Sequence, residues 1–172
     1  MCRRPLLSPP TGLEPVISRS IAADMFTATG SPTQAVIDAM KDALDADAAL
    51  DALITGVYGH LSEVARTSYP YVVLGRRHRR NDGGAMQVAG GQVTVDLDIW
   101  SDHKGPSKAH AICSRIVEIL ERRDLALEGF TLIKGSLTCE FEDVFDEPDE
   151  DKPGSRLYHG VQRWICETHE SI

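Results

Sequence analysis

Residues 92–101 constrain the fold most strongly, because their side chains alternate strictly in character along the chain. One alternating set is aliphatic: Val93, Val95, Leu97 and Ile99. The other set is mainly polar: Thr94, Asp96, Asp98 and Trp100. A period of two puts successive side chains on opposite faces of a β-strand, so we expect one face on the core and the other in solvent. This pattern is typical of an antiparallel sheet with one covered face.

The elements expected around this strand predict an α+β fold. Apolar residues at helical spacing predict one helix from Ser31, a short second helix that ends at Gly56, and a long helix that begins near Pro106. Further strands are expected where β-branched and aromatic residues gather, in residues 71–74, 131–141 and 157–167. The order α-α-β-β-α-β-β predicts an antiparallel sheet of about four main strands with helices packed on one face.

We expect a single domain preceded by a disordered N-terminal extension. Residues 1–30 contain four prolines that interrupt any regular period, so they are expected to stay outside the fold. Residues 31–170 form the domain, and a content of 42% hydrophobic residues is sufficient for a core. Met25 lies just before the first helix, which leaves two alternatives: a disordered arm, or a natural start at Met25.

The cysteines and the apolar stretches indicate no cofactor, metal or membrane partner. None of the cysteines has the spacing of a zinc site, and we interpret them as reduced, small hydrophobic side chains. They are Cys2, Cys113, Cys139 and Cys166. Every apolar run is shorter than the ~20 residues needed to cross a bilayer. We therefore expect a soluble protein that binds no cofactor.

The sharpest local signal is a basic cluster in a glycine-rich stretch that we expect to form a loop. Its positive charges are Arg76, Arg77, Arg79 and Arg80. Three interpretations stay open: a subunit or lumen contact, a solvated loop, or a contact with nucleic acid phosphates. The cluster has no interleaved aromatic residues for base stacking, and the net charge of −8 disfavours a dedicated nucleic-acid binder.

A second charged segment, residues 140–152, contains eight acidic residues and one basic residue. We expect it to form an extended acidic hairpin loop between the last two strands. The acidic residues are Glu140, Glu142, Asp143, Asp146, Glu147, Asp149, Glu150 and Asp151. They lack the spacing and central glycine of an EF-hand, so we expect no Ca²⁺ site. The loop is either a soluble tip or an electrostatic contact for the arginine loop of a neighbouring subunit.

No catalytic site is predicted. Asp96 and Asp98 project from one strand face, which we interpret as a solvated face rather than an acid–base or metal pair. Asp102 and His103 are expected in a turn and helix cap, because no nucleophile elbow accompanies them. The glycine pairs lack the lysine and the strand–helix context of a phosphate-binding loop. We therefore predict a non-enzymatic protein.

Several segments in order resemble the tail-completion (tail terminator) family of long-tailed bacteriophages. They are residues 69–75 (YPYVVLG), 93–101 (VTVDLDIWS), the helix over 105–120, and 159–164 (HGVQRW). The opening helix, followed by DADAAL at 45–50 and GVY at 56–58, also fits this family. The resemblance covers roughly residues 33–168. Related proteins of this family occur in prophages and gene transfer agents.

The resemblance implies a structural virion protein without catalytic residues, assembled in the bacterial host cytoplasm. Such proteins form a ring, typically of six subunits, at the head-proximal end of the tail tube. The ring stops tube polymerisation and joins the tail to the head. The implied partners are further copies of the chain, the tail tube protein and the head–tail connector, with a possible non-specific contact to passing DNA.

Three other functions remain open from the sequence. Within the same class, the chain could be a head-side connector or neck protein. It could also be a small nucleic-acid-binding regulator that uses the arginine loop. A metal-dependent hydrolase that uses Asp96, Asp98 and His103 is the third.

Overall fold

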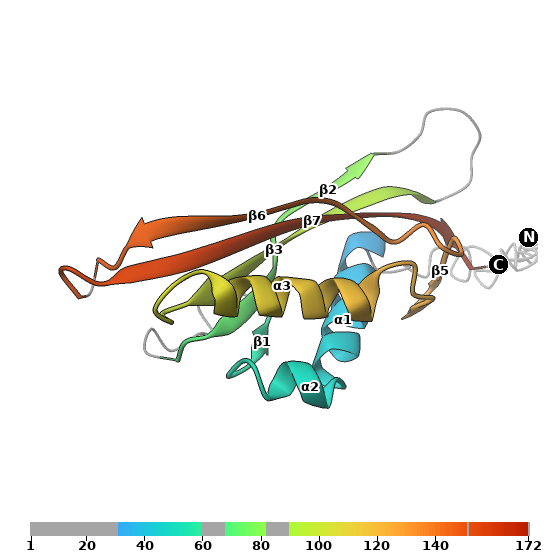
Figure 1. The fold of residues 1–172 in the computed structure, drawn as a ribbon. Coiled ribbons are helices and arrows are strands. Elements are labelled where there is room, and N and C mark those ends of the chain that lie inside the picture. The colour runs from blue at the N-terminus through green and yellow to red at the C-terminus, as the bar shows by residue number, and fades with distance from the viewer. Residues whose placement is uncertain (1–30, 60–67, 82–89, 151, 172) are drawn as a thin grey trace, which may run out of the picture.

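The computed structural model describes residues 31–59, 68–81, 90–150 and 152–171, with only the backbone described at 76–81 and 90. The expected N-terminal extension, residues 1–30, lies outside the described residues. The fold is built on one seven-stranded sheet in the order β1-β2-β3-β7-β5-β4, with β6 also paired to β7 (Figure 1). The strands are β1 (Val57–Tyr58), β2 (Tyr71–Asn81), β3 (Gly90–Ser101), β4 (Ala126–Leu127), β5 (Phe130–Leu132), β6 (Thr138–Pro148) and β7 (Arg156–Glu170).

The predicted α+β class with about four antiparallel strands is therefore wrong. The protein is mostly β, and its curled sheet is mixed because β1 runs parallel to β2. The prediction missed β1 and β4, which are two residues long and too short to show a period. It also merged two strands, because the expected strand over 131–141 covers most of β5 and the start of β6. The long strands also continue further than expected, with eleven residues in β2 and fifteen in β7.

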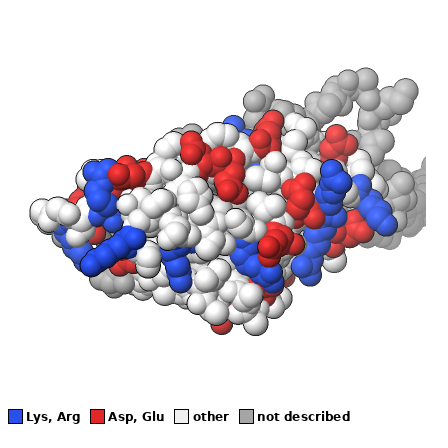
Figure 2. Space-filling model, viewed as in Figure 1, with Lys and Arg blue, Asp and Glu red and all other residues white. Residues whose placement is uncertain are grey.

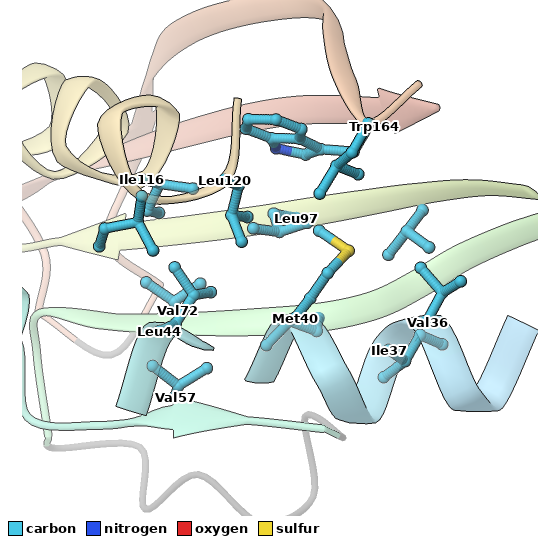
Figure 3. Packing of buried hydrophobic residues seen from close by; sticks show 14 of the residues in the cluster. Val36, Ile37, Met40, Leu44, Val57, Val72, Leu97, Ile116, Leu120 and Trp164 are labelled. Atoms are coloured by element: carbon cyan, nitrogen blue, oxygen red, sulfur yellow. The ribbon is translucent and has the colours of Figure 1, made fainter. Parts of the chain in front are cut away.

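Three helices, α1 (Pro32–Asp45), α2 (Ala48–Asp51) and α3 (Ser107–Leu120), lie on one face of the sheet (Figure 1). The apolar stripe of α1 and the aliphatic side of β3 meet in the core, where Met40 extends toward Leu97 (Figure 3). Trp164 and Leu120 complete this part of the cluster from β7 and α3, and each is at most 1% exposed. The core thus holds both long helices against β3 and β7.

The described cysteines behave as small core residues. Cys113, Cys139 and Cys166 form no disulfide with one another, and Cys113 and Cys166 are buried. Burial disfavours a charged thiolate, and it raises the pKa of each of these two buried thiols to about 12. Cys2 lies outside the described residues.

Close contact between α3 and β7 requires a glycine at position 160. A Cβ atom there would lie 2.9 Å from Cys113 Sγ and 3.3 Å from Ile99 Cβ. We expect Gly160→Ala to lower the free energy of unfolding by about 1–3 kcal/mol, because the core must shift to accept the methyl group. Urea denaturation measures this change.

Two controls test that explanation. The double variant Gly160→Ala/Cys113→Ala should recover part of the loss, since it removes the sulfur atom that the new methyl group meets. Gly59→Ala should have little effect, because nothing lies within 4 Å of a Cβ at that position. Equal effects of the substitutions at 59 and 160 would contradict the steric account.

Asp47 ties α2 to α3. Its carboxylate accepts the Leu50 backbone N–H at 2.8 Å and two bonds from Arg115, Nε at 3.0 Å and Nη2 at 2.7 Å. The bond from Arg115, and then the one from Leu50, lowers the pKa of Asp47 from 3.8 to about 2. The ionised form is therefore favoured in the folded chain.

This lowered pKa predicts a pH-dependent effect of Asp47→Asn. A carboxyl whose pKa falls on folding contributes stability above its unfolded pKa and loses it as the pH falls through the folded value. The variant should have a lower urea midpoint than the wild type at pH 5, and the difference should shrink from pH 4 toward pH 2. A difference that stays constant over this range would show that the charge is not responsible.

Candidate functional site

The sheet face opposite the helices carries the polar groups of the long strands. The side chains that share this face are given by the strand registers: Asp96, Asp98 and Trp100 of β3, His159, Val161 and Arg163 of β7, and Phe141, Asp143 and Phe145 of β6. We call this set the outer face. The aliphatic set of β3 lies on the other side, against the helices.

An ion pair between a buried carboxylate and a partly exposed guanidinium lies on the outer face between neighbouring strands. Arg163 donates from Nε to Asp96 Oδ1 at 2.8 Å and from Nη2 to Oδ2 at 3.2 Å. The two bonds match the fork of the guanidinium to the two carboxylate oxygens, and they raise the pKa of Arg163. Asp96 is 6% exposed, whereas the Arg163 side chain is 43% exposed, so the pair joins the two strands at the surface of the outer face.

A second cluster surrounds His159. Its Nε2 lies 2.7 Å from Asp98 Oδ1, and its Nδ1 lies 3.1 Å from Glu147 Oε1. The imidazole also stacks on Trp100, with ring centroids 3.9 Å apart. A neutral imidazole has one N–H donor, so both contacts are full hydrogen bonds only when the ring carries two protons. Both ring nitrogens are therefore engaged within the fold.

The prediction that Asp96 and Asp98 form a solvated face is thus wrong. Each aspartate is 6% exposed and bonded to a cation or imidazole on β7. Alternation alone could not reveal this, because the partners lie more than sixty residues away in the sequence. Asp102 and His103 are exposed near the end of β3. Among the described residues, no three His, Cys, Asp or Glu side chains are arranged to hold a metal.

Strand β6 adds an exposed aromatic strip to the edge of the outer face. Phe141 and Phe145 are 46% and 43% exposed, and Asp143 stands between them. We call these three residues the β6 strip. Aromatic side chains that share one exposed strand face are suited to contact with a partner. The sequence predicted no role for either phenylalanine: Phe141 ended the expected strand over 131–141, and Phe145 fell in the expected acidic loop.

The acidic residues of the expected hairpin loop lie mainly in a strand. Residues from Glu140 to Glu147 belong to β6, and the turn to β7 begins at Asp149. Several have partners within the chain: Glu142 accepts a bond from Gln162, Asp146 pairs with Arg156, and Glu147 contacts His159. Asp149 is buried and Glu150 is exposed, whereas Asp151 lies outside the described residues. The loop prediction was wrong for the part in β6.

Two carboxylates and a proline shape the outer edge of β6. Asp143 accepts the backbone N–H of Val144 at 2.8 Å, and Glu121 accepts that of Cys139 at 3.0 Å. Pro148, which has no N–H to donate, ends the strand. These features protect an edge against the addition of another strand.

The predicted arginine loop also proves to be strand in its backbone. Residues 76–80 belong to β2, with Arg79 opposite Thr94 and Arg80 opposite Val93. A bulge separates this part from the paired segment that ends at Leu74, next to Gly75 with φ of 74°. The side chains of Arg76, Arg77, Arg79 and Arg80 lie outside the described residues.

The basic part of β2 and the acidic strand β6 lie on opposite sides of β3 and β7. Figure 1 shows the β6–β7 hairpin at one end of the sheet, whereas β2 extends toward the other end. The face that carries α3 shows no comparable separation of charge, because acidic and basic side chains are interspersed across it (Figure 2). No described helix is long and apolar enough to span a bilayer.

Comparisons with known proteins identify relatives of this fold. The sequence profile of the family described as tail completion protein gp17 matches residues 38–165. A chain in the structure titled "Virion of native gene transfer agent (GTA) particle" has the same fold, with a TM-score of 0.68 and 21% identity. That match covers 81% of this chain and 98% of the other. No curated protein matches the sequence.

Proposed function

Because the chain belongs to the tail completion protein gp17 family of phage tail structural proteins, we propose that it caps the head-proximal end of the tail tube as a ring. The family places the protein in the virion tail. The proposed ring, typically of six subunits, stops tube polymerisation and provides the surface that joins the tail to the head. Its proposed partners are the tail tube protein and the head–tail connector.

The family match carries this proposal, because it spans α1 to β7 and thus nearly all of the described fold. The gene transfer agent chain supports it further: almost all of that chain superimposes on this one, and its title names a virion. Two exposed phenylalanines, Phe141 and Phe145, lie among the charged side chains of β6. They are consistent with a surface that a partner covers in an assembly.

We propose a structural rather than a catalytic role for the outer face. Its one histidine, His159, is 8% exposed and has each ring nitrogen against a carboxylate. A general acid or base must reach the atom from which it takes or to which it gives a proton. A ring stacked on Trp100 and held from both nitrogens is better suited to fixing β3, β6 and β7 in register.

Deletion of the gene from its phage or prophage tests the proposal. Induced lysates are imaged by negative-stain electron microscopy, with the wild-type gene supplied in trans as the control. We expect overlong tails, or tails that are not joined, beside filled heads, and we expect complementation to restore complete particles. Complete particles with tails of normal length in the deletion strain would refute the proposed function.

A further inference from the structure

We propose that the β6 strip binds an arginine- or lysine-bearing segment of another protein in the virion. This inference rests on the proposed function, because it specifies one contact between the protein and a neighbour in the tail. Among the described residues, three large hydrophobic side chains are exposed, and two of them are Phe141 and Phe145. Both lie on one face of β6 with Asp143 between them, so a partner at this edge meets two rings and a carboxylate together.

Side chains that β3 holds in place stand beside the two rings. Phe141 lies opposite Arg163, whose guanidinium makes two hydrogen bonds to Asp96 of β3. Phe145 lies opposite His159, and the centroids of these two rings are 6.4 Å apart. The imidazole in turn stacks on a tryptophan of β3. The surroundings of the strip are therefore fixed before a partner arrives, which reduces the entropy lost on binding.

The centre of the strip combines a carboxylate with an apolar neighbour. Asp143 is exposed and lies opposite Val161 of β7. Residues two apart in a strand are separated by about 7 Å, so each phenylalanine stands about 7 Å from the aspartate along β6. Asp143 Oδ1 accepts the backbone N–H of Val144, and no lysine or arginine of the described chain pairs with the carboxylate. Its negative charge is therefore available to a partner.

This combination selects a cation that is carried on an apolar stem. Guanidinium and ammonium groups bind carboxylates, and they are attracted to the faces of aromatic rings. The methylene stems of arginine and lysine pack on apolar surface while their charged ends stay in water. Strand β6 contains acidic residues and no basic one, which disfavours nucleic acid phosphates. The net charge of −8 also opposes the approach of a second copy, so a basic segment of a different protein fits the strip best.

Reversal of the central charge tests the electrostatic half of the contact. In the deletion strain, Asp143→Lys supplied in trans should lower the yield of complete particles about tenfold or more, because like charges then face each other. Asp143→Glu keeps the charge and should stay close to the wild type. Glu128→Lys makes the same reversal at an exposed position between β4 and β5 and should assemble normally. Thermal melting of the purified variants verifies that each one folds.

Removal of both rings tests the apolar half. The double variant Phe141→Ala/Phe145→Ala should lower the yield of complete particles about tenfold or more, because aromatic anchors carry much of the binding energy of an interface. The matched control is Ile133→Ala, since Ile133 is 42% exposed but lies outside β6. This control should assemble normally.

Photo-crosslinking in complete particles identifies the occupant. Phe145 is replaced by the aromatic analogue p-benzoylphenylalanine, the purified particles are irradiated, and mass spectrometry identifies the crosslinked peptide. We expect a peptide of another virion protein that contains arginine or lysine beside the crosslinked residue. A crosslink to a second copy of this chain, a crosslink to DNA, or no crosslink would overturn the inference. The same analogue at Ile133 should not capture the peptide that position 145 captures.

The outcomes separate this inference from the proposed function. Folded Asp143→Lys and double-alanine variants that assemble as the wild type does would overturn the contact, and they would leave the proposed function standing. Complete virions in the deletion strain itself would refute the proposed function instead.

Discussion

Trp164→Ala should lower the free energy of unfolding by about 3–5 kcal/mol, the largest effect that we expect from a single substitution. Trp164 is 1% exposed and fills the core between β7 and α3. Alanine would leave a cavity that the sheet cannot close, because β7 pairs with β3 on one side and with β5 and β6 on the other. Such a loss is a large part of the total stability of a domain, about 5–15 kcal/mol.

Two further variants define the cause of this loss. Trp164→Phe keeps an aromatic ring in the core but removes the hydrogen bond that Nε1 donates to Gln162 Oε1. We expect it to lower the free energy of unfolding less than Trp164→Ala does. Phe145→Ala removes a ring that is 43% exposed and should change the stability of the isolated chain little. Urea or guanidinium denaturation measures all three. Similar losses at positions 145 and 164 would contradict the assignment of Trp164 to the core.

The second large effect is expected at His159. Replacement by phenylalanine keeps a ring to stack on Trp100 but removes the contacts with Asp98 and Glu147. The Asp98 side chain is 8% exposed, so the substitution removes a hydrogen-bond partner from a buried carboxylate. We expect His159→Phe to lower the free energy of unfolding by about 2–4 kcal/mol.

His159→Gln is the matched control, because its amide can still donate a hydrogen bond. Its loss should be clearly smaller than that of the phenylalanine variant in the same denaturation experiment. If the His159→Phe variant proves as stable as the wild type, the contacts with Asp98 and Glu147 contribute nothing to the free energy of unfolding. The stack on Trp100 alone would then hold the cluster.

The sequence predicted the elements that have a clear period. Residues 92–101 lie within β3 with the aliphatic set in the core, and the apolar stripes mark α1 and α3. The resemblance to the tail-completion family is confirmed by the match over residues 38–165, and so is the location in the virion tail. These features depend on local pattern or on ordered motifs, which a single sequence contains.

The features that were missed depend on distant partners. The carboxylates Asp96 and Asp98 alternate as a solvated strand face does, and only the pairing of β3 with β7 brings Arg163 and His159 to them. In the same way, β6 has the composition of an acidic loop. Its pairing along β7 makes it a strand and leaves Phe141 and Phe145 on one face. The α+β prediction was wrong for the same reason: it did not foresee the length of the paired strands, which dominate the fold.

Cryo-electron microscopy of the intact particle tests the central claim most directly. A reconstruction of the junction between head and tail should show a ring of copies of this fold on the last layer of the tail tube. A junction built without this chain, or a particle that carries the chain only at the distal end of the tail, would contradict the account.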